Sequence, residues 1–275
     1  MKKLKKLAIG TILTAGVLLT AACGNGNEAT GEETTTVKLG VVGEVNEPWE
    51  YVKEQLAADG INLELVKFSD YATPNTALAE GELDLNSFQT KIFMEAFNED
   101  HGEDLTPIGD TVIAPLGIYS SDLKDISEIK ENDTIAIPND VSNEGRALLL
   151  LQTAGLIEVD PAKGQVPVVE DVTSNPLNLT FQPLDSSQTA RALEDVAASV
   201  INSGMAVDAG FIPTEDAIFL EPVTESSDPY VNAIVVRGED KDNELYNKIV
   251  AAYQTDGTKE VIEKTSKGSS IPVWK

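Results

Sequence analysis

Apolar and polar positions alternate in short segments along most of the chain, and segments with helical spacing separate them. Val37 to Val41 and Ile61 to Leu65 show the period of two that is typical of strands. Trp49 to Ala58 shows helical spacing and stops before Gly60, a residue suited to the end of a helix. The same criteria predict further strands at 82–85, 111–119, 134–137, 177–181, 198–201 and 231–236, and further helices at 75–80, 89–97, 142–154, 187–196, 243–254 and 259–265.

The order of these elements predicts the α/β fold class, with parallel-rich sheets covered by helices on both faces. The alternation runs in two blocks, which are joined by extended segments near 115–120 and 226–232. We therefore predict two α/β lobes. The first lobe comprises residues 36–120 plus 227–275, and the second comprises residues 121–226.

The first residues of the chain have the layout of a secretory signal peptide. Lysines at positions 2, 3, 5 and 6 precede an apolar run from Leu7 to Leu19, which is shorter than the ~20 residues of a membrane span. The only cysteine, Cys23, follows small residues at the expected cleavage site, as in bacterial lipoprotein signals, although Thr20 stands where those signals usually carry leucine. We predict that residues 1–22 are a lipoprotein signal peptide, that Cys23 is lipidated, and that residues 23–35 form a flexible tether.

The charge balance bears on the possible partners. Asp and Glu number 46 against 20 Lys and Arg, which gives a formal net charge of −26. A chain this acidic lacks the basic surface that nucleic acids require, so no nucleic-acid partner is expected. An acidic body also stays away from an anionic membrane surface, which is consistent with attachment through the lipid alone.

The residue types needed for many kinds of chemistry are scarce. One cysteine and one histidine exclude a disulfide framework and Cys/His zinc sites. The single histidine, His101, lies among acids at a predicted helix end, where a surface position is expected rather than a metal site. No nucleophile-elbow, P-loop or strand-linked dinucleotide motif occurs. We therefore expect no enzymatic activity, no cofactor and no metal.

One segment combines features of a ligand site. Residues 139–146 follow the buried-type strand at 134–137 and begin the helix at 142–154. Ligands of open α/β sheets bind at the carboxyl ends of strands, and helix N-termini attract anions. Arg146 lies in the first turns of this helix, where its charge opposes the helix dipole. Its guanidinium either binds a ligand carboxylate or pairs with a surface acid such as Glu144, and the sequence alone leaves both alternatives open.

Several segments together resemble the methionine-binding lipoproteins, also called NlpA lipoproteins. The resemblance covers nearly the whole predicted mature chain in order. It rests on Thr134–Asp140, Asn143–Gln152, Ala154–Leu156, Asp70-Tyr71 with Pro74-Asn75, Gly81–Gln89, Phe97-Asn98 with His101-Gly102, Val200–Asn202, Pro229–Arg237 and Ile271-Pro272. The resemblance implies a two-lobed fold of the periplasmic-binding-protein type (type II), with a ligand cleft between the lobes. It also implies that the protein is the solute-binding component of an ABC importer.

The resemblance also implies roles for individual residues. Arg146 is expected to hold the α-carboxylate of the ligand, and Asn143 to assist it. Asn202 and Asn232 are expected to contact the amino and carboxylate groups. Two aromatic residues, Tyr71 and Phe88, are expected to wall an apolar slot for the ligand side chain, although isolated aromatic residues more often belong to the core.

The chain departs from the family pattern beside this slot. Thr90 and Phe93 stand where the family usually has histidine and tyrosine, and Ser203 follows Val-Ile-Asn where glycine is usual. An apolar wall of Phe88, Phe93 and Tyr71 still favours a thioether or aliphatic side chain. The smaller Thr90 leaves room for a dipeptide.

Taken together, these patterns predict a monomeric, lipid-anchored protein on the extracytoplasmic face of the cell membrane. It would deliver L-methionine, or a closely related amino acid, to ABC permease and ATPase subunits. The alternatives are a methionine-containing dipeptide, another amino acid, or a surface protein without a transport role, such as a hydrolase or an adhesin. A hydrolase would need a nucleophile–base pair, and 5% aromatic residues argue against a large adhesive face.

Overall fold

The computed structural model describes residues 34–274. The predicted signal peptide, Cys23 and most of the predicted tether lie outside these residues. Among the described helices, none has both the length and the apolar character needed to cross a membrane.

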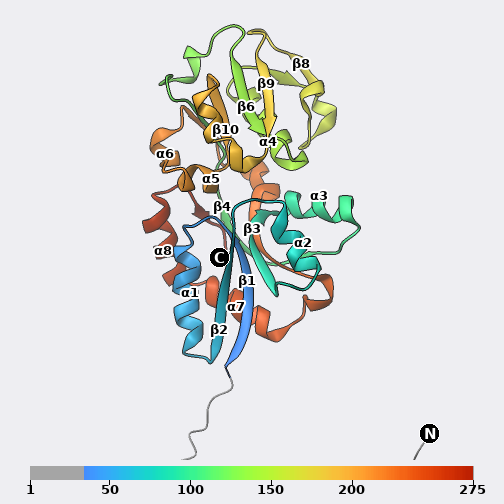
Figure 1. Ribbon diagram of the computed structural model, residues 1–275, viewed down its shortest axis with the longest axis vertical. Helices are drawn as coiled ribbons and strands as arrows, with labels where there is room; N and C mark the ends of the chain where they lie inside the picture. Colours follow the sequence, from blue (N-terminus) through green and yellow to red (C-terminus); the bar gives the residue numbers. More distant parts are fainter. Residues whose placement is uncertain (1–33, 275) are drawn as a thin grey trace, which may run out of the picture. The chain divides into compact units, whose positions relative to one another are not determined.

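Strands from both ends of the described segment form a six-stranded sheet in the order β13-β4-β12-β3-β1-β2 (Figure 1). The strand β1 is parallel to β2 and β3, whereas β12 is antiparallel to β3 and β4, and β13 is antiparallel to β4. The strands are β1 (Thr35–Val42), β2 (Ile61–Phe68), β3 (Leu85–Thr90), β4 (Thr106–Ile113), β12 (Val231–Val236) and β13 (Ile271–Pro272).

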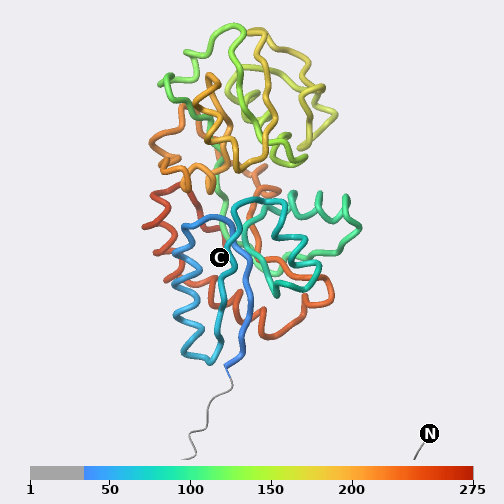
Figure 2. The backbone as a smooth tube through the Cα atoms, in the orientation of Figure 1, coloured from blue at the N-terminus to red at the C-terminus, as the bar shows by residue number. Residues whose placement is uncertain are grey.

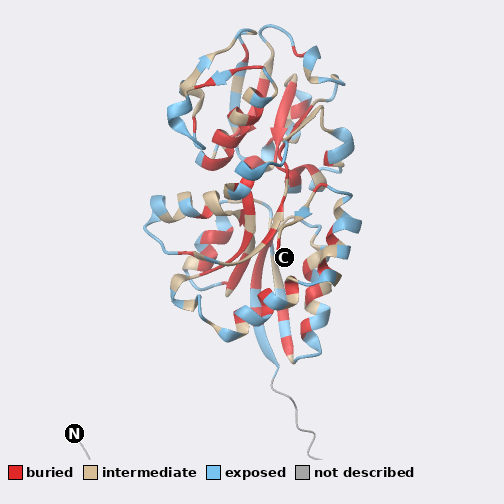
Figure 3. Ribbon diagram, turned by 180° about the vertical axis from the view of Figure 1, so that it is seen from behind, coloured by how far each residue is buried: buried red, intermediate tan, exposed pale blue. Residues whose placement is uncertain are grey.

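Helices cover both faces of this first sheet because its strands are apolar on both sides. In β12, Ile234 and Val236 pack into the core under α1 (Glu47–Ala57), α7 (Glu244–Tyr253) and α8 (Asp256–Ser266). The alternate residues, Ala233 and Val235, pack into the core on the side of α2 (Thr73–Ala79) and α3 (Lys91–His101). Because successive side chains of a strand point to opposite faces, this one strand contributes to the cores on both sides of the sheet. The buried strands lie between partly exposed helices (Figure 3).

The middle of the chain forms a second sheet in the order β11-β5-β10-β6-β9. The strands β10, β6 and β9 are parallel, with β9 at one edge; β5 is antiparallel to β10, and β11, at the other edge, is antiparallel to β5. The strands are β5 (Gly117–Tyr119), β6 (Thr134–Pro138), β9 (Thr180–Leu184), β10 (Ala198–Ile201) and β11 (Phe219–Leu220), and β7 (Glu158–Val159) pairs separately with β8 (Val172–Ser174). Helix α4 (Val141–Thr153) packs its leucines on this sheet, and the short helices α5 (Ser203–Asp208) and α6 (Pro213–Asp216) follow β10.

The chain passes between the two sheets twice (Figure 2). The first crossing lies at 114–116, between β4 and β5, and the second lies between β11 and β12 and contains a 3-10 segment, Glu225–Tyr230. The prediction of one strand over 111–119 is therefore wrong. The two halves pair in different sheets, and Pro115, which lacks a backbone N–H, stands at the break. The two sheets support the proposed division into two lobes, with the first boundary at 114–116 rather than 120.

Three other predicted elements differ from the structure. The strand expected at 177–181 is β9 at Thr180–Leu184. The predicted helix at 187–196 consists of two 3-10 segments, Ser186–Gln188 and Arg191–Glu194. The strand expected at 82–85 is β3 at Leu85–Thr90, so α3 begins only at Lys91. The buried residues Asn86 and Gln89 conceal this strand because they are polar and do not read as core positions. Gln89 donates to Asn86, and both side chains also hydrogen-bond Asn75 inside the protein.

Candidate functional site

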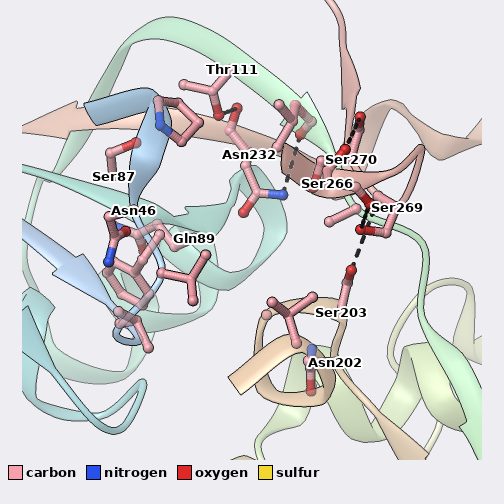
Figure 4. A pocket seen from close by; sticks show the side chains of 18 of the residues that line it. Asn46, Ser87, Gln89, Thr111, Asn202, Ser203, Asn232, Ser266, Ser269 and Ser270 are labelled. Carbon is pink, nitrogen blue, oxygen red and sulfur yellow. Dashed lines mark hydrogen bonds between the residues drawn. The ribbon is translucent and has the colours of Figure 1, made fainter. Parts of the chain in front are cut away.

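A cavity of about 250 Å³ lies where the ends of several strands meet (Figure 4). Residues after β1, at the end of β3, after β6 and after β10 contribute to its lining, as expected for the carboxyl ends of strands in α/β sheets. All eight residues predicted to bind ligand line this one cavity: Tyr71, Phe88, Thr90, Phe93, Asn143, Arg146, Asn202 and Asn232.

Arg146 is buried at the cavity wall, with 4% of its side chain exposed. Its Nε donates to Oε1 of Glu221 at 2.9 Å, and its Nη2 donates to Oε2 of the same carboxylate. Nη2 also donates to the carbonyl of Ala114 at 3.0 Å, and the ring of Tyr230 lies 4.4 Å from the guanidinium carbon. Within residues 34–274, Nη1 has no hydrogen-bond partner, so this nitrogen can donate to a ligand carboxylate.

Glu221 is a residue that the sequence analysis missed. Its carboxylate also accepts a hydrogen bond from Leu116 N at 2.9 Å, so it joins Arg146 to the beginning of β5. The acid considered as a partner from the sequence, Glu144, instead accepts from Val169 N at 3.0 Å. Arg146 therefore pairs with an acid, as one alternative had it, and retains one free donor nitrogen.

Three asparagine side chains add polar groups to the wall. Asn232, in β12, donates through Nδ2 to the carbonyl of Val112 at 3.2 Å, which leaves its Oδ1 as an acceptor on the cavity side (Figure 4). Asn202, directly after β10, donates through Nδ2 to Oδ1 of Asn143 at 2.8 Å. The cavity thus presents a cationic donor together with amide acceptors, which is the complement of a zwitterionic amino acid.

Three aromatic rings form the apolar part of the lining. The ring centroids of Tyr71 and Phe88 are 5.9 Å apart, and those of Phe93 lie 6.2 Å from Tyr71 and 5.9 Å from Phe88. All three side chains are partly exposed, unlike core aromatics such as Tyr119. Burial raises the pKa of the Tyr71 phenol, and the nearby carboxylates of Asp140 and Asp208 add to this shift, so the hydroxyl stays protonated at physiological pH.

Thr90 has a local structural role at the edge of this slot. It is the last residue of β3 and the N-cap of α3, where its Oγ1 accepts from Phe93 N at 3.3 Å. Thr90 also lines the cavity. Threonine therefore fits this turn without supplying the ring that histidine would add.

A buried amide network behind the aromatic residues was not foreseen. Asn75, in α2, exchanges hydrogen bonds with Gln89 at 2.7 and 2.6 Å, and Asn86 donates to Asn75 at 2.8 Å. These contacts join the start of α2, just after Tyr71, to the strand that carries Phe88. The network therefore fixes the two walls of the slot relative to each other.

Serine residues and one aspartate connect the second-sheet side of the cavity to the first-sheet side. Ser203 donates to the carbonyl of Ser269 at 3.3 Å (Figure 4), and Glu44 N donates to Asp208 at 3.2 Å. The two residues of each contact lie far apart along the chain, so the sequence pattern did not indicate these contacts. Among the described residues, no cluster of three or more His, Cys, Asp or Glu side chains is suited to hold a metal ion.

The fold and the site define a class of protein. Two α/β sheets joined by two crossings, with a cavity lined from both, are typical of the substrate-binding proteins of ABC transporters, and known structures of this class are similar. An ABC-transporter periplasmic substrate-binding protein from Coxiella burnetii matches with a TM-score of 0.81 and 34% identity, over 86% of this chain and all of that one. The predicted fold class is confirmed.

Residues 37–274 match the NlpA lipoprotein family, and the chain belongs to this family. It is 36% identical, over 97% of each chain, to the D-methionine-binding lipoprotein MetQ of Escherichia coli K12. The solved structure of a Burkholderia cenocepacia nutrient-binding protein bound to methionine is 40% identical with a TM-score of 0.83, over 86% of this chain and 100% of that one. Protein PG110 of Staphylococcus aureus is 42% identical with a TM-score of 0.84, over 86% and 94% of the two chains. The resemblance noted from the sequence is confirmed.

Proposed function

We propose that this protein binds methionine outside the cytoplasm and delivers it to an ABC importer. The observation that carries the proposal is the free Nη1 of Arg146 in the same cavity as the rings of Tyr71, Phe88 and Phe93. Arginine holds carboxylates well, and sulfur packs favourably on aromatic edges. The names of the Escherichia coli and Burkholderia cenocepacia relatives support the same ligand.

Transport follows from a shift between open and closed arrangements of the two lobes. A ligand that contacts residues from both sheets, such as Arg146 and Asn232, stabilises the closed arrangement by its additional contacts there. Permease and ATPase subunits would then recognise the loaded form, and the protein itself would act as a monomer without a catalytic step. A hydrolase is disfavoured because His101 does not line the cavity and its Nδ1 contacts the carbonyl of Phe97 at 3.0 Å.

A methionine-containing dipeptide is a second candidate ligand. Thr90 is smaller than the histidine usual in the family, and the cavity continues past the aromatic residues to Ser203, Ser266 and Ser269. Each of these hydroxyl groups donates its proton to a backbone carbonyl, so each offers only an acceptor, which suits the N–H of an additional peptide unit. Size and polarity of this extension favour the dipeptide over a large apolar amino acid.

A thermal-shift screen tests the ligand directly. L-methionine, D-methionine, the other amino acids and methionine-containing dipeptides are added to ligand-free protein. The proposed ligand, at about 100 times its Kd, stabilises the fold by about 2.7 kcal/mol and raises Tm by about 5–10 °C. Stabilisation by lysine or glutamate alone would exclude the apolar slot, and no stabilisation by any member would overturn the proposal. Native mass spectrometry of freshly purified protein identifies a retained ligand independently.

Attachment through Cys23, which lies outside the described residues, gives a separate prediction. Two or more acyl chains hold a protein stably on a membrane, whereas none are available without this cysteine. Cys23→Ala protein should therefore stay unprocessed or be released, and globomycin should block maturation of the wild type. Membrane fractionation checks this, and normal processing of a membrane-bound Cys23→Ala protein would contradict the proposed anchor.

A further inference from the structure

A chain of three hydrogen-bonded side chains runs behind the second-sheet wall of the cavity. Both carboxylate oxygens of Asp140 accept from Nδ2 of Asn143, at 3.0 and 2.9 Å. Oδ1 of Asn143 in turn accepts from Nδ2 of Asn202 at 2.8 Å. Asn143 and Asn202 line the cavity, whereas Asp140 does not.

The first member of this chain fixes the direction of the other two. An ionised carboxylate only accepts hydrogen bonds, so Asn143 must turn its NH₂ group toward Asp140. This leaves Oδ1 of Asn143 facing Asn202, which must then donate with its own NH₂ group. As a result, Asn202 has only its oxygen left for other partners.

The remaining oxygen is not satisfied by the protein. Asn202 is 8% exposed, and its Oδ1 has no hydrogen-bond partner within residues 34–274. Of the buried side-chain atoms without partners in the described chain, which are in Tyr119, Ser186, Asn202 and Trp274, only that of Asn202 belongs to a cavity-lining residue. A buried acceptor without a donor is unfavourable, so this position is suited to a ligand that donates.

We propose that Asp140 is a positioning residue that, through Asn143, fixes the Asn202 amide with its oxygen ready to accept a hydrogen bond from the ligand's α-ammonium group. The site thereby selects ligands with a protonated amino group over those without a donor at that position. This inference rests on the proposed amino-acid ligand. It assigns a specificity role to a side chain that does not itself touch the ligand.

The inference is tested by comparing L-methionine with its des-amino analogue, 4-(methylthio)butanoate, by calorimetry. The analogue keeps the carboxylate and the thioether, and it lacks the ammonium group with its donors and its positive charge. In the wild-type protein it should bind about 10- to 100-fold more weakly, as is typical for loss of a hydrogen bond to a charged group. The ratio of the two Kd values measures the selection for the ammonium group.

Asp140→Asn is the diagnostic variant. Asparagine is as good an N-cap as aspartate, so the variant can keep the hydrogen bond from Asn143 N that caps α4. Its NH₂ group, however, no longer forces the orientation of Asn143, so the amides of Asn143 and Asn202 can turn over. We expect a wild-type Tm and a Kd ratio that falls by about tenfold, mostly through weaker L-methionine binding.

Two further variants separate the chain of hydrogen bonds from other effects. Asp160→Asn removes the same charge from an N-cap position that does not line the cavity, and it should leave the ratio unchanged. In an Asn202→Ala background, Asp140→Asn should no longer change the ratio, because its effect passes through Asn202.

Each result that contradicts an expectation identifies which proposal is wrong. A ratio within about twofold of wild type in Asp140→Asn would overturn the inference while the proposed function stands. If Asp140→Asn lowered the Kd ratio equally in the Asn202→Ala background, the effect would come from the charge of Asp140 alone. That result would also overturn the inference. Absence of any L-methionine binding by the wild type would instead contradict the proposed function.

Discussion

Arg146→Ala is expected to weaken binding of L-methionine by about 2–4 kcal/mol, because the ligand carboxylate loses its charged partner in a buried site. The same substitution should lower the free energy of unfolding of the ligand-free protein by about 2–4 kcal/mol, because it leaves Glu221, 14% exposed, without its counter-ion. Calorimetry measures the first effect and chemical denaturation measures the second. Unchanged affinity in a folded variant would exclude Arg146 as the carboxylate-binding residue.

Glu221→Gln is the matched control for this prediction. It removes the negative charge that faces the guanidinium, and it keeps Arg146 in place. Stability should fall, because a neutral amide replaces one half of a buried ion pair. Affinity for a carboxylate ligand should be maintained or increased, since Arg146 is then less neutralised. The pair of variants therefore separates the structural role of Arg146 from its role in binding.

The sequence suggested that Arg146 binds the ligand, but it did not suggest that Arg146 stabilises the fold. The position of Arg146 at the start of a helix, where its charge opposes the dipole, suggested that its removal would cost the fold little. The structure leads us to expect a larger cost, because the guanidinium binds Glu221 and the carbonyl of Ala114, which lie on the two different crossings. One acid among 46, far from Arg146 along the chain, carries no local pattern that distinguishes it from the others.

The periodicity of apolar residues predicted most helices and strands. It failed where contacts with distant parts of the chain determine where a strand begins or ends. Thr111 to Tyr119 reads as one apolar strand because both halves are buried, but they are buried in different sheets. The strand β3 was misplaced because Asn86 and Gln89 are buried as a hydrogen-bonded pair rather than as apolar residues. A local pattern cannot report partners that arrive from elsewhere in the chain.

The ligand-binding roles of the candidate site residues remain predictions, but the structure brings these residues together. All eight proposed ligand-contacting residues line one cavity. Six were chosen from the resemblance, and Thr90 and Phe93 were chosen because they replace family residues expected beside the slot. The residues that hold them in place, such as Asp140, Asn75 and Glu221, were not identified. Their roles depend on hydrogen-bond direction and on burial, which only the three-dimensional arrangement reveals.

Phe88→Ala is expected to weaken L-methionine binding by about 1.5–3 kcal/mol. Phe88 packs against both Tyr71 and Phe93, with each ring centroid 5.9 Å away, so its removal takes one wall from the slot and loosens the other two. The carboxylate contact at Arg146 is unaffected. The loss should therefore be large for methionine and small for alanine, whose side chain does not reach the slot.

Calorimetry with methionine, norleucine and alanine on both proteins measures this difference. Phe97→Ala is the matched control, because Phe97 lies on the same helix as Phe93 but stacks on His101 at 4.2 Å and does not line the cavity. That variant should reduce stability and leave the order of ligand affinities intact. If Phe88→Ala weakened methionine and alanine equally, the three aromatic rings would not form the slot for the ligand side chain. A selective loss for methionine and norleucine would place the ligand side chain against Phe88, because only those ligands extend far enough to lose contact area there.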